Sequence, residues 1–187
     1  MRCRICGNLT FKIFCKSCIA LLAPSPRQIK KLDLNIISFY EYDEIEKLLK
    51  FKYDKFGDKV LHGLAKLSFL PFFQEFQSEE KLTVIPIDDF NKNFSHTAIF
   101  AKYCKTKTVK PQFQTLKARN QIKYAGKDLE FRLGNPKDFQ LKRNLEHNVI
   151  LVDDVITTGT TLLEAKETIE KKGVKVVLAL TLAHAIQ

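Results

Sequence analysis

Residues 149–161 read V-I-L-V-D-D-V-I-T-T-G-T-T, and this stretch decides the fold of the chain. Its first four residues are apolar with no polar alternation, which is typical of a strand buried on both faces of a parallel sheet. Asp153 and Asp154 follow where such a strand would end, and apolar residues then recur at helical spacing from Leu162 to Ile169. The stretch therefore predicts a strand, a turn and a helix whose N-terminus lies at the C-terminal edge of the sheet.

The predicted turn consists of four threonines around one glycine. A helix N-terminus offers unpaired N–H groups and the positive end of the helix dipole, so it accepts phosphate readily. Gly159 lets the backbone approach an anion closely, and the threonine hydroxyls add further donors. We therefore expect a phosphate group at this turn. The residues concerned are Thr157, Thr158, Gly159, Thr160 and Thr161.

Asp153 and Asp154 repel phosphate, so we expect them to hold another part of the same ligand. Sugar hydroxyls and a magnesium ion both suit paired carboxylates. A phosphate at one end of the site and a diol or a metal ion at the other predicts a phosphorylated ribose. The alternative is a threonine-capped helix behind a buried strand, with no ligand. Paired acids beside five phosphate-loop residues favour the binding site.

Four cysteines near the N-terminus form the pattern C-x2-C-x8-C-x2-C. They are Cys3, Cys6, Cys15 and Cys18. Two C-x-x-C pairs suit tetrahedral zinc; the alternatives are two short disulfides, which suit a secreted protein better, or a redox pair, which does not need two copies. Four sulfur ligands leave no open position for a substrate, so we expect a structural zinc ion. Cys104 is left over and is predicted to be a small core residue.

The composition is that of a soluble globular protein, with 187 residues, 45% of them hydrophobic and 28% charged. Neither an apolar run of transmembrane length nor a signal-peptide pattern is visible, so we expect a cytoplasmic location. Lys and Arg number 31 against 21 Asp and Glu, which gives a net charge of +10. This excess favours polyanionic partners, nucleic acid first and acidic membrane surfaces second; the alternative is a lysine-rich solvated surface.

The chain divides into three predicted segments: a zinc-binding module at 1–24, a linker at 25–35 and an α/β domain at 36–187. Within the domain, 105–143 interleaves positive charges with aromatic rings, as a single-strand binding surface requires. The alternative is an active-site flap with solvated lysines. The four histidines have no metal-ligand spacing and are predicted to be surface or core residues; they are His62, His96, His147 and His184.

The strand and turn at 149–161 resemble the 5-phosphoribosyl-1-pyrophosphate (PRPP) loop of the type I phosphoribosyltransferases. In that family the two acids contact the ribose hydroxyls and the turn wraps the 5-phosphate. The resemblance implies these roles for Asp153, Asp154 and residues 157–161. It also implies a parallel sheet flanked by helices, and a pyrophosphate loop at Pro86, Ile87 and Asp88, for which a plain strand end is the alternative.

A four-cysteine knuckle followed by such a domain resembles the ComF family of competence proteins. The order of motifs agrees, with segments 42–51, 84–87 and 114–120 before the ribose-phosphate loop. One departure is that K-N-F-S-H at 92–96 stands where the family usually has R-G-F-N-Q. Lysine does not replace the bidentate contacts of arginine. The nucleic-acid candidates are Lys92, Phe94, Lys117, Arg119, Lys123 and Tyr124.

The ComF resemblance implies a PRPP-binding protein that handles incoming single-stranded DNA during natural transformation, on the cytoplasmic side of the inner membrane. Implied partners are a ComF-type helicase, the inner-membrane DNA channel and recombination proteins, with magnesium accompanying PRPP. The alternative is an active phosphoribosyltransferase that moves the ribosyl group to a nitrogen nucleophile and releases pyrophosphate. A PRPP-sensing regulator is a minor alternative, since no helix-turn-helix pattern is visible.

Overall fold

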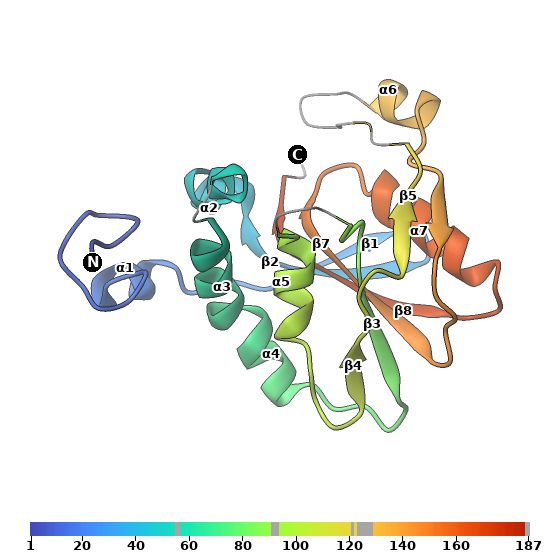
Figure 1. Ribbon diagram of the computed structural model, residues 1–187, viewed down its shortest axis with the longest axis horizontal. Coiled ribbons are helices and arrows are strands. Elements are labelled where there is room, and N and C mark those ends of the chain that lie inside the picture. Colours follow the sequence, from blue (N-terminus) through green and yellow to red (C-terminus); the bar gives the residue numbers. More distant parts are fainter. Residues whose placement is uncertain (55–56, 91–93, 121, 123–128, 186–187) are drawn as a thin grey trace.

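The computed structural model describes residues 1–54, 57–90, 94–120, 122 and 129–185 (Figure 1). The N-terminal part consists of α1 (Lys16–Leu21), β1 (Arg27–Lys31), β2 (Leu34–Glu41), α2 (Tyr42–Leu49), the 3-10 helix η1 (Lys50–Tyr53), α3 (Gly57–Leu67) and α4 (Phe69–Glu75). The remainder consists of β3 (Leu82–Pro86), α5 (His96–Lys102), β4 (Val109–Pro111), β5 (Leu116–Ala118), α6 (Leu129–Gly134), β6 (Phe139–Leu141), β7 (Asn148–Ile156), α7 (Thr160–Glu170) and β8 (Val176–His184).

A six-stranded sheet in the order β1-β2-β8-β7-β3-β4 forms the centre of the domain. Every pairing in it is parallel except that of β1 with β2. Helices α2 to α5 cover one face and α7 covers the other (Figure 1). The predicted α/β fold with a mostly parallel sheet between helices is therefore confirmed, and β7 occupies a central position between β8 and β3.

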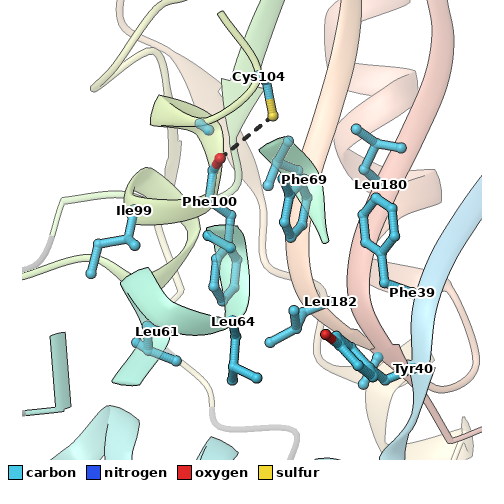
Figure 2. Close-up of a cluster of buried hydrophobic side chains, with 14 of the residues drawn as sticks. Phe39, Tyr40, Leu61, Leu64, Phe69, Ile99, Phe100, Cys104, Leu180 and Leu182 are labelled. Atoms are coloured by element: carbon cyan, nitrogen blue, oxygen red, sulfur yellow. Dashed lines mark hydrogen bonds between the residues drawn. The ribbon is translucent and has the colours of Figure 1, made fainter. Parts of the chain in front are cut away.

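The core beneath α3 to α5 is built around phenylalanine rings (Figure 2). Phe69 and Phe100 are stacked with ring centroids 5.1 Å apart, and Phe39 from β2 lies 4.7 Å from Phe69. Cys104 is fully buried in the same cluster, and its thiol donates to the Phe100 carbonyl at 3.5 Å. The fifth cysteine is thus a core residue, as predicted.

Helix α3 ends at Leu67, shortly before the phenylalanine-rich residues 69–73. They begin a second helix, α4, after a break at Ser68. Pro71 is compatible with this helix because it lies in the first turn, where an N–H has no intrahelical acceptor. Phe69 and Phe73 can therefore both enter the core.

The segment expected to be a linker, 25–35, contributes a strand to the sheet. Its residues Arg27–Lys31 form β1, which pairs antiparallel with β2 through a tight turn at Leu32, whose φ is +51°. Apolar Ile29 lies between the exposed polar residues Gln28 and Lys30, which suits an edge strand with one solvated face. The connection between the cysteine module and the sheet is therefore shorter than predicted.

The cysteine module packs against the α/β domain. Phe14 is 2% exposed and belongs to the same hydrophobic cluster as α3. A Cβ added at Gly63 of α3 would lie 2.7 Å from the Phe14 ring and 2.8 Å from Ile13, so glycine permits this close approach. Tyr40 donates from its hydroxyl to the Leu22 carbonyl at 3.0 Å. The module is therefore docked on the α/β domain.

Candidate functional site

Strand β7 carries both acids of the predicted site. It continues through Asp153 and Asp154 to Ile156, because β8 runs beside it and pairs Asp153 with Thr181 and Ile156 with His184. The acids therefore lie within the last part of the strand, whereas the sequence predicted that the strand ends before them. The turn and α7 follow directly, as predicted, and α7 begins at Thr160.

The phosphate turn has the backbone that the sequence predicts. Gly159 is the N-cap of α7 with φ of +84°, a left-handed conformation that glycine adopts without steric cost. Thr158 and Thr160 share a hydrogen bond between their hydroxyls at 3.0 Å. The first amides of the helix have no intrahelical acceptor, so the turn retains the donors that an anion needs.

Two basic side chains from distant elements lie at this turn. Arg132 of α6 donates from Nη1 to the hydroxyl of Thr157 and, at 3.4 Å, to that of Thr158. Lys31 of β1 runs past the glycine, since a Cβ added at Gly159 would lie 3.4 Å from Cγ of Lys31. Figure 1 shows α6 at the end of the domain where β7 leads into α7. The Arg132 guanidinium therefore places a positive charge at the turn, which favours a phosphate.

Asp154 is held by two basic residues. Its Oδ2 lies 2.6 Å from Nζ of Lys52 and 3.4 Å from Nε2 of His96, while its Oδ1 accepts from the Val155 amide at 2.8 Å. The side chains of Lys52, His96 and Asp154 are 20%, 26% and 15% exposed. Lys52 comes from η1 and His96 is the first residue of α5, so three separate elements converge on one carboxylate.

The two carboxyls have opposite electrostatic environments. Burial and the adjacent Asp154 carboxyl raise the pKa of Asp153. Burial also disfavours the charged form of Asp154, but His96 and Lys52 outweigh it and lower the pKa of Asp154. Burial lowers the pKa of His96. The strand therefore presents one firmly ionised acid, Asp154, beside an acid that resists ionisation.

The predicted pyrophosphate loop lies beside this cluster. Pro86 pairs with Val152 on β7, and the Ile87 amide donates to the Val152 carbonyl at 2.9 Å. Thr97, next to His96, donates from its hydroxyl to the Ile87 carbonyl at 2.9 Å. Asp88 has φ of +48° and accepts from the Ala118 amide of β5 at 3.2 Å. The loop is therefore adjacent to the acids, but the Ile87 amide is already paired within the protein.

The nucleic-acid candidates occupy different environments. Lys117 lies 5.5 Å above the Phe90 ring, and the exposed Arg119 contacts Asp138 at 3.3 Å. Phe94 packs against the hydrophobic core and offers less ring surface for a base than the sequence predicts. Three candidates, Lys92, Lys123 and Tyr124, lie outside the described residues.

The four cysteines of the N-terminal module form one cluster. Their sulfur atoms all lie within 4.8 Å of one another, with Cys6 and Cys15 at 3.6 Å, and none of them is in a disulfide. Gly7 takes φ of +77° directly after the second cysteine, and the Cys15 amide donates to the sulfur of Cys3 at 3.3 Å. Such a set of four soft ligands fits a tetrahedral metal ion.

Sequence reasoning missed four side chains of the site, those of Lys31, Lys52, His96 and Arg132. No role was predicted for Lys31 or Lys52, and His96 was predicted to be a surface or core residue. Arg132 was one of many basic residues in the 105–143 segment. A local signal existed only for His96, which stands at the last position of the unusual K-N-F-S-H segment. The contact of Lys52 with Asp154 joins residues 102 positions apart, so no spacing pattern could reveal it.

A comparison with protein families matches residues 99–187 to the phosphoribosyl transferase domain. The matched part contains Arg132, both acids and the phosphate turn. It supports a phosphoribosyltransferase-type domain, the class that the strand, turn and acid pair predict. No curated protein matches the sequence.

Three solved structures are similar to the chain at low identity. A hypoxanthine phosphoribosyltransferase from Staphylococcus aureus is 15% identical over 68% of this chain and 64% of its own, with a TM-score of 0.41. An adenine phosphoribosyl transferase from Trypanosoma brucei, in complex with AMP, pyrophosphate and ribose-5-phosphate, is 15% identical over 78% and 69%, with a TM-score of 0.43. Adenine phosphoribosyltransferase from Leishmania tarentolae is 11% identical over 89% and 86%, with a TM-score of 0.43. The chain thus spans less than two thirds of the S. aureus protein.

Among the described residues, no helix has both the length and the apolar character needed to cross a membrane.

Proposed function

We propose that the protein binds PRPP at the end of β7 and handles incoming single-stranded DNA during natural transformation. The observation that carries the PRPP assignment is the placement of opposite charges along one strand and turn. Arg132 lies at the threonine hydroxyls, and the acids lie a few residues earlier on β7. A ligand with a phosphate at one end and hydroxyls at the other matches this arrangement.

The turn would hold the 5-phosphate through the helix amides, the threonine hydroxyls and Arg132. Asp153 and Asp154 would hold the ribose hydroxyls and, together with the phosphate oxygens of PRPP, a magnesium ion. Magnesium is commonly bound by one or two carboxylates plus substrate phosphates, so the two acids fit it. When bound, the ion would neutralise part of the charge of the pyrophosphate.

The cysteine cluster would hold a structural zinc ion. Its four sulfurs fill a tetrahedral coordination shell and leave no position for a substrate. Cys3 and Cys18 are buried against the domain, so the ion would stabilise the surface that Phe14 uses for docking.

The DNA-handling part of the proposal is supported by the resemblance to the ComF family and by the net charge of +10. Lys117 of β5 and Arg119, which directly follows β5, lie close to the loop that follows β3. We propose that the protein acts in the cytoplasm, peripheral at the inner membrane, with a ComF-type helicase, the DNA channel and recombination proteins as partners.

Calorimetry tests the PRPP assignment. We expect the wild-type protein to bind PRPP in magnesium, and Asp153→Asn/Asp154→Asn to bind at least about tenfold more weakly, because loss of the charge-assisted bond at the ionised Asp154 alone costs about 1.5–3 kcal/mol. Asp138→Asn, an exposed acid that contacts Arg119, is the matched control. Wild-type protein that does not bind PRPP would refute the assignment.

Fluorescence anisotropy with a labelled oligonucleotide tests the DNA assignment separately. Affinity for single strands should fall with salt, with a slope of about −0.7 per neutralised phosphate. Lys117→Gln/Arg119→Gln should weaken binding and make this slope shallower. A salt-independent affinity would contradict the electrostatic basis of the proposal.

An active phosphoribosyltransferase is the second candidate, favoured by the family match over residues 99–187. Such enzymes act through positioning and electrostatic stabilisation of the developing charge, and Asp154 is already held in a fixed charged network. Release of pyrophosphate from PRPP, measured across nucleobases and amines, would establish it. If no acceptor gives pyrophosphate release, the protein binds PRPP without turning it over.

A further inference from the structure

Lys52 is placed at the end of the site opposite to Arg132. Its Nζ lies 2.6 Å from Oδ2 of Asp154, and His96 reaches the same oxygen at 3.4 Å. Arg132, by contrast, contacts Thr157 and Thr158 at the phosphate turn. The two cationic groups thus stand at the two ends of the strand and turn that would hold the ribose.

The charges around Lys52 explain why a cation is needed there. Asp154 is firmly ionised, and Asp88 of the neighbouring loop is close enough to His96 to affect its pKa. Carboxylates alone at this end would repel a second anionic group of the ligand. The Lys52 ammonium, only 20% exposed, offsets that repulsion where water screens it little.

The backbone links this cluster to the predicted pyrophosphate loop. Ile87 bonds through its amide to Val152, next to Asp153, and through its carbonyl to Thr97, next to His96. The Ile87 amide is consequently not available to an anion. Of the predicted pyrophosphate loop, Pro86 has no amide N–H and the Ile87 amide is paired, which favours a contribution from side-chain donors. Lys52 and His96 both reach Asp154 and are placed to supply it.

We infer that Lys52, assisted by His96, recognises the pyrophosphate of PRPP and so determines the preference for PRPP over ribose 5-phosphate. The inference rests on the proposed PRPP site and assigns one part of the ligand to residues outside the family-matched segment. Lys52 precedes residue 99 in the chain, so the C-terminal match alone does not include this end of the site.

The ratio of dissociation constants for ribose 5-phosphate and PRPP, measured by calorimetry in fixed magnesium, tests the inference. We expect the wild type to prefer PRPP, and Lys52→Met to lose about tenfold or more of that preference while its affinity for ribose 5-phosphate changes little. Lys50→Met is the matched control, because Lys50 lies in the same 3-10 helix but is 66% exposed and paired with Glu46 at 2.9 Å.

An unchanged ratio in Lys52→Met overturns the inference, as does an equal loss for both ligands. If the wild type binds neither ligand, the proposed function fails as well, so the two failures are distinguishable. A second measurement needs no variant: acetylation of wild-type lysines, followed by mass spectrometry. Inorganic pyrophosphate should slow acetylation of Lys52 and leave Lys50 unaffected, whereas equal rates at Lys52 with and without pyrophosphate count against the inference.

Discussion

The cysteine module and the candidate ligand site are built in opposite ways. The four sulfurs of the module come from a single segment, 3–18, in which they lie within 4.8 Å of one another. The ligand site draws Lys31 from β1, Lys52 from η1, His96 from α5 and Arg132 from α6 around β7. A local sequence pattern can specify the cysteine module, whereas the residues of the ligand site come together only in the assembled sheet.

The two regions also differ in what stabilises them. The α/β domain has large buried clusters on both faces of its sheet. The module buries Phe14 and Leu22 but exposes Leu9 by 82% and Phe11 by 102%, so it has little core of its own. Short segments of this kind usually depend on a metal ion or on docking for their structure.

Replacing one buried cysteine should give the largest effect. We expect Cys18→Ser to abolish binding of one zinc ion per chain and to unfold residues 1–22, because structural zinc supplies on the order of 10 kcal/mol of folding free energy in such modules. Cys104→Ala, outside the cluster, should keep the metal. Elemental analysis and amide hydrogen exchange measure these outcomes.

The same variant tests whether the two regions are independent. PRPP affinity of Cys18→Ser should stay within about twofold of the wild type, since no ligand-site residue comes from the module. If Cys18→Ser also loses PRPP binding, the module supports the ligand site through α3. The two regions would then not be independent.

The sequence predicted the parts of the fold that depend on local pattern. The buried run at 149–152, the glycine-centred turn and the helix behind it all follow from residue type and spacing, and the structure has them. Strand β1 was missed because an edge strand with charged residues carries little hydrophobic signal. Helix α4 is hard to predict from the sequence because it contains Pro71, which is tolerated only because it lies in the first turn.

The basic residues that contact the acid of the site could not be predicted from sequence patterns. Lys52 and Asp154 are 102 positions apart, and nothing in the sequence around Lys52 indicates that it reaches the predicted acid. The K-N-F-S-H segment does contain one informative residue, since His96 begins α5 and reaches Asp154. Its significance depends on the pairing of β3 with β7, which places the start of α5 beside the acids.

Arg132→Ala should have the next largest effect, this time on the ligand site alone. Loss of its guanidinium from the Thr157 and Thr158 hydroxyls should weaken binding of PRPP and of ribose 5-phosphate by about the same factor, roughly tenfold or more, as expected for a lost charge-assisted contact of about 1.5–3 kcal/mol. Calorimetry with both ligands measures this.

Arg119→Ala is the control for this prediction, because Arg119 is 65% exposed and contacts Asp138. An equal loss in both variants would point to general charge rather than to a contact at the turn. If Arg132→Ala lowers the affinity for PRPP but not for ribose 5-phosphate, Arg132 contacts the pyrophosphate and not the 5-phosphate. That result would contradict the assignment of the 5-phosphate to Arg132 and of the pyrophosphate to Lys52.

Gly63→Ala should have the smallest effect and addresses the boundary between the two regions. Alanine favours a helix interior over glycine by about 1 kcal/mol. At Gly63, however, the added Cβ would lie 2.7 Å from the Phe14 ring, and overpacking of this kind costs about 1–3 kcal/mol. We expect a net loss of about 1 kcal/mol in unfolding free energy, together with faster hydrogen exchange in residues 13–19. Gly134→Ala, where an added Cβ meets nothing within 4 Å, should not destabilise the protein. If Gly63→Ala is more stable than the wild type and its hydrogen exchange is unchanged, the module can shift away from α3 without loss of stability. Its docking would then be loose.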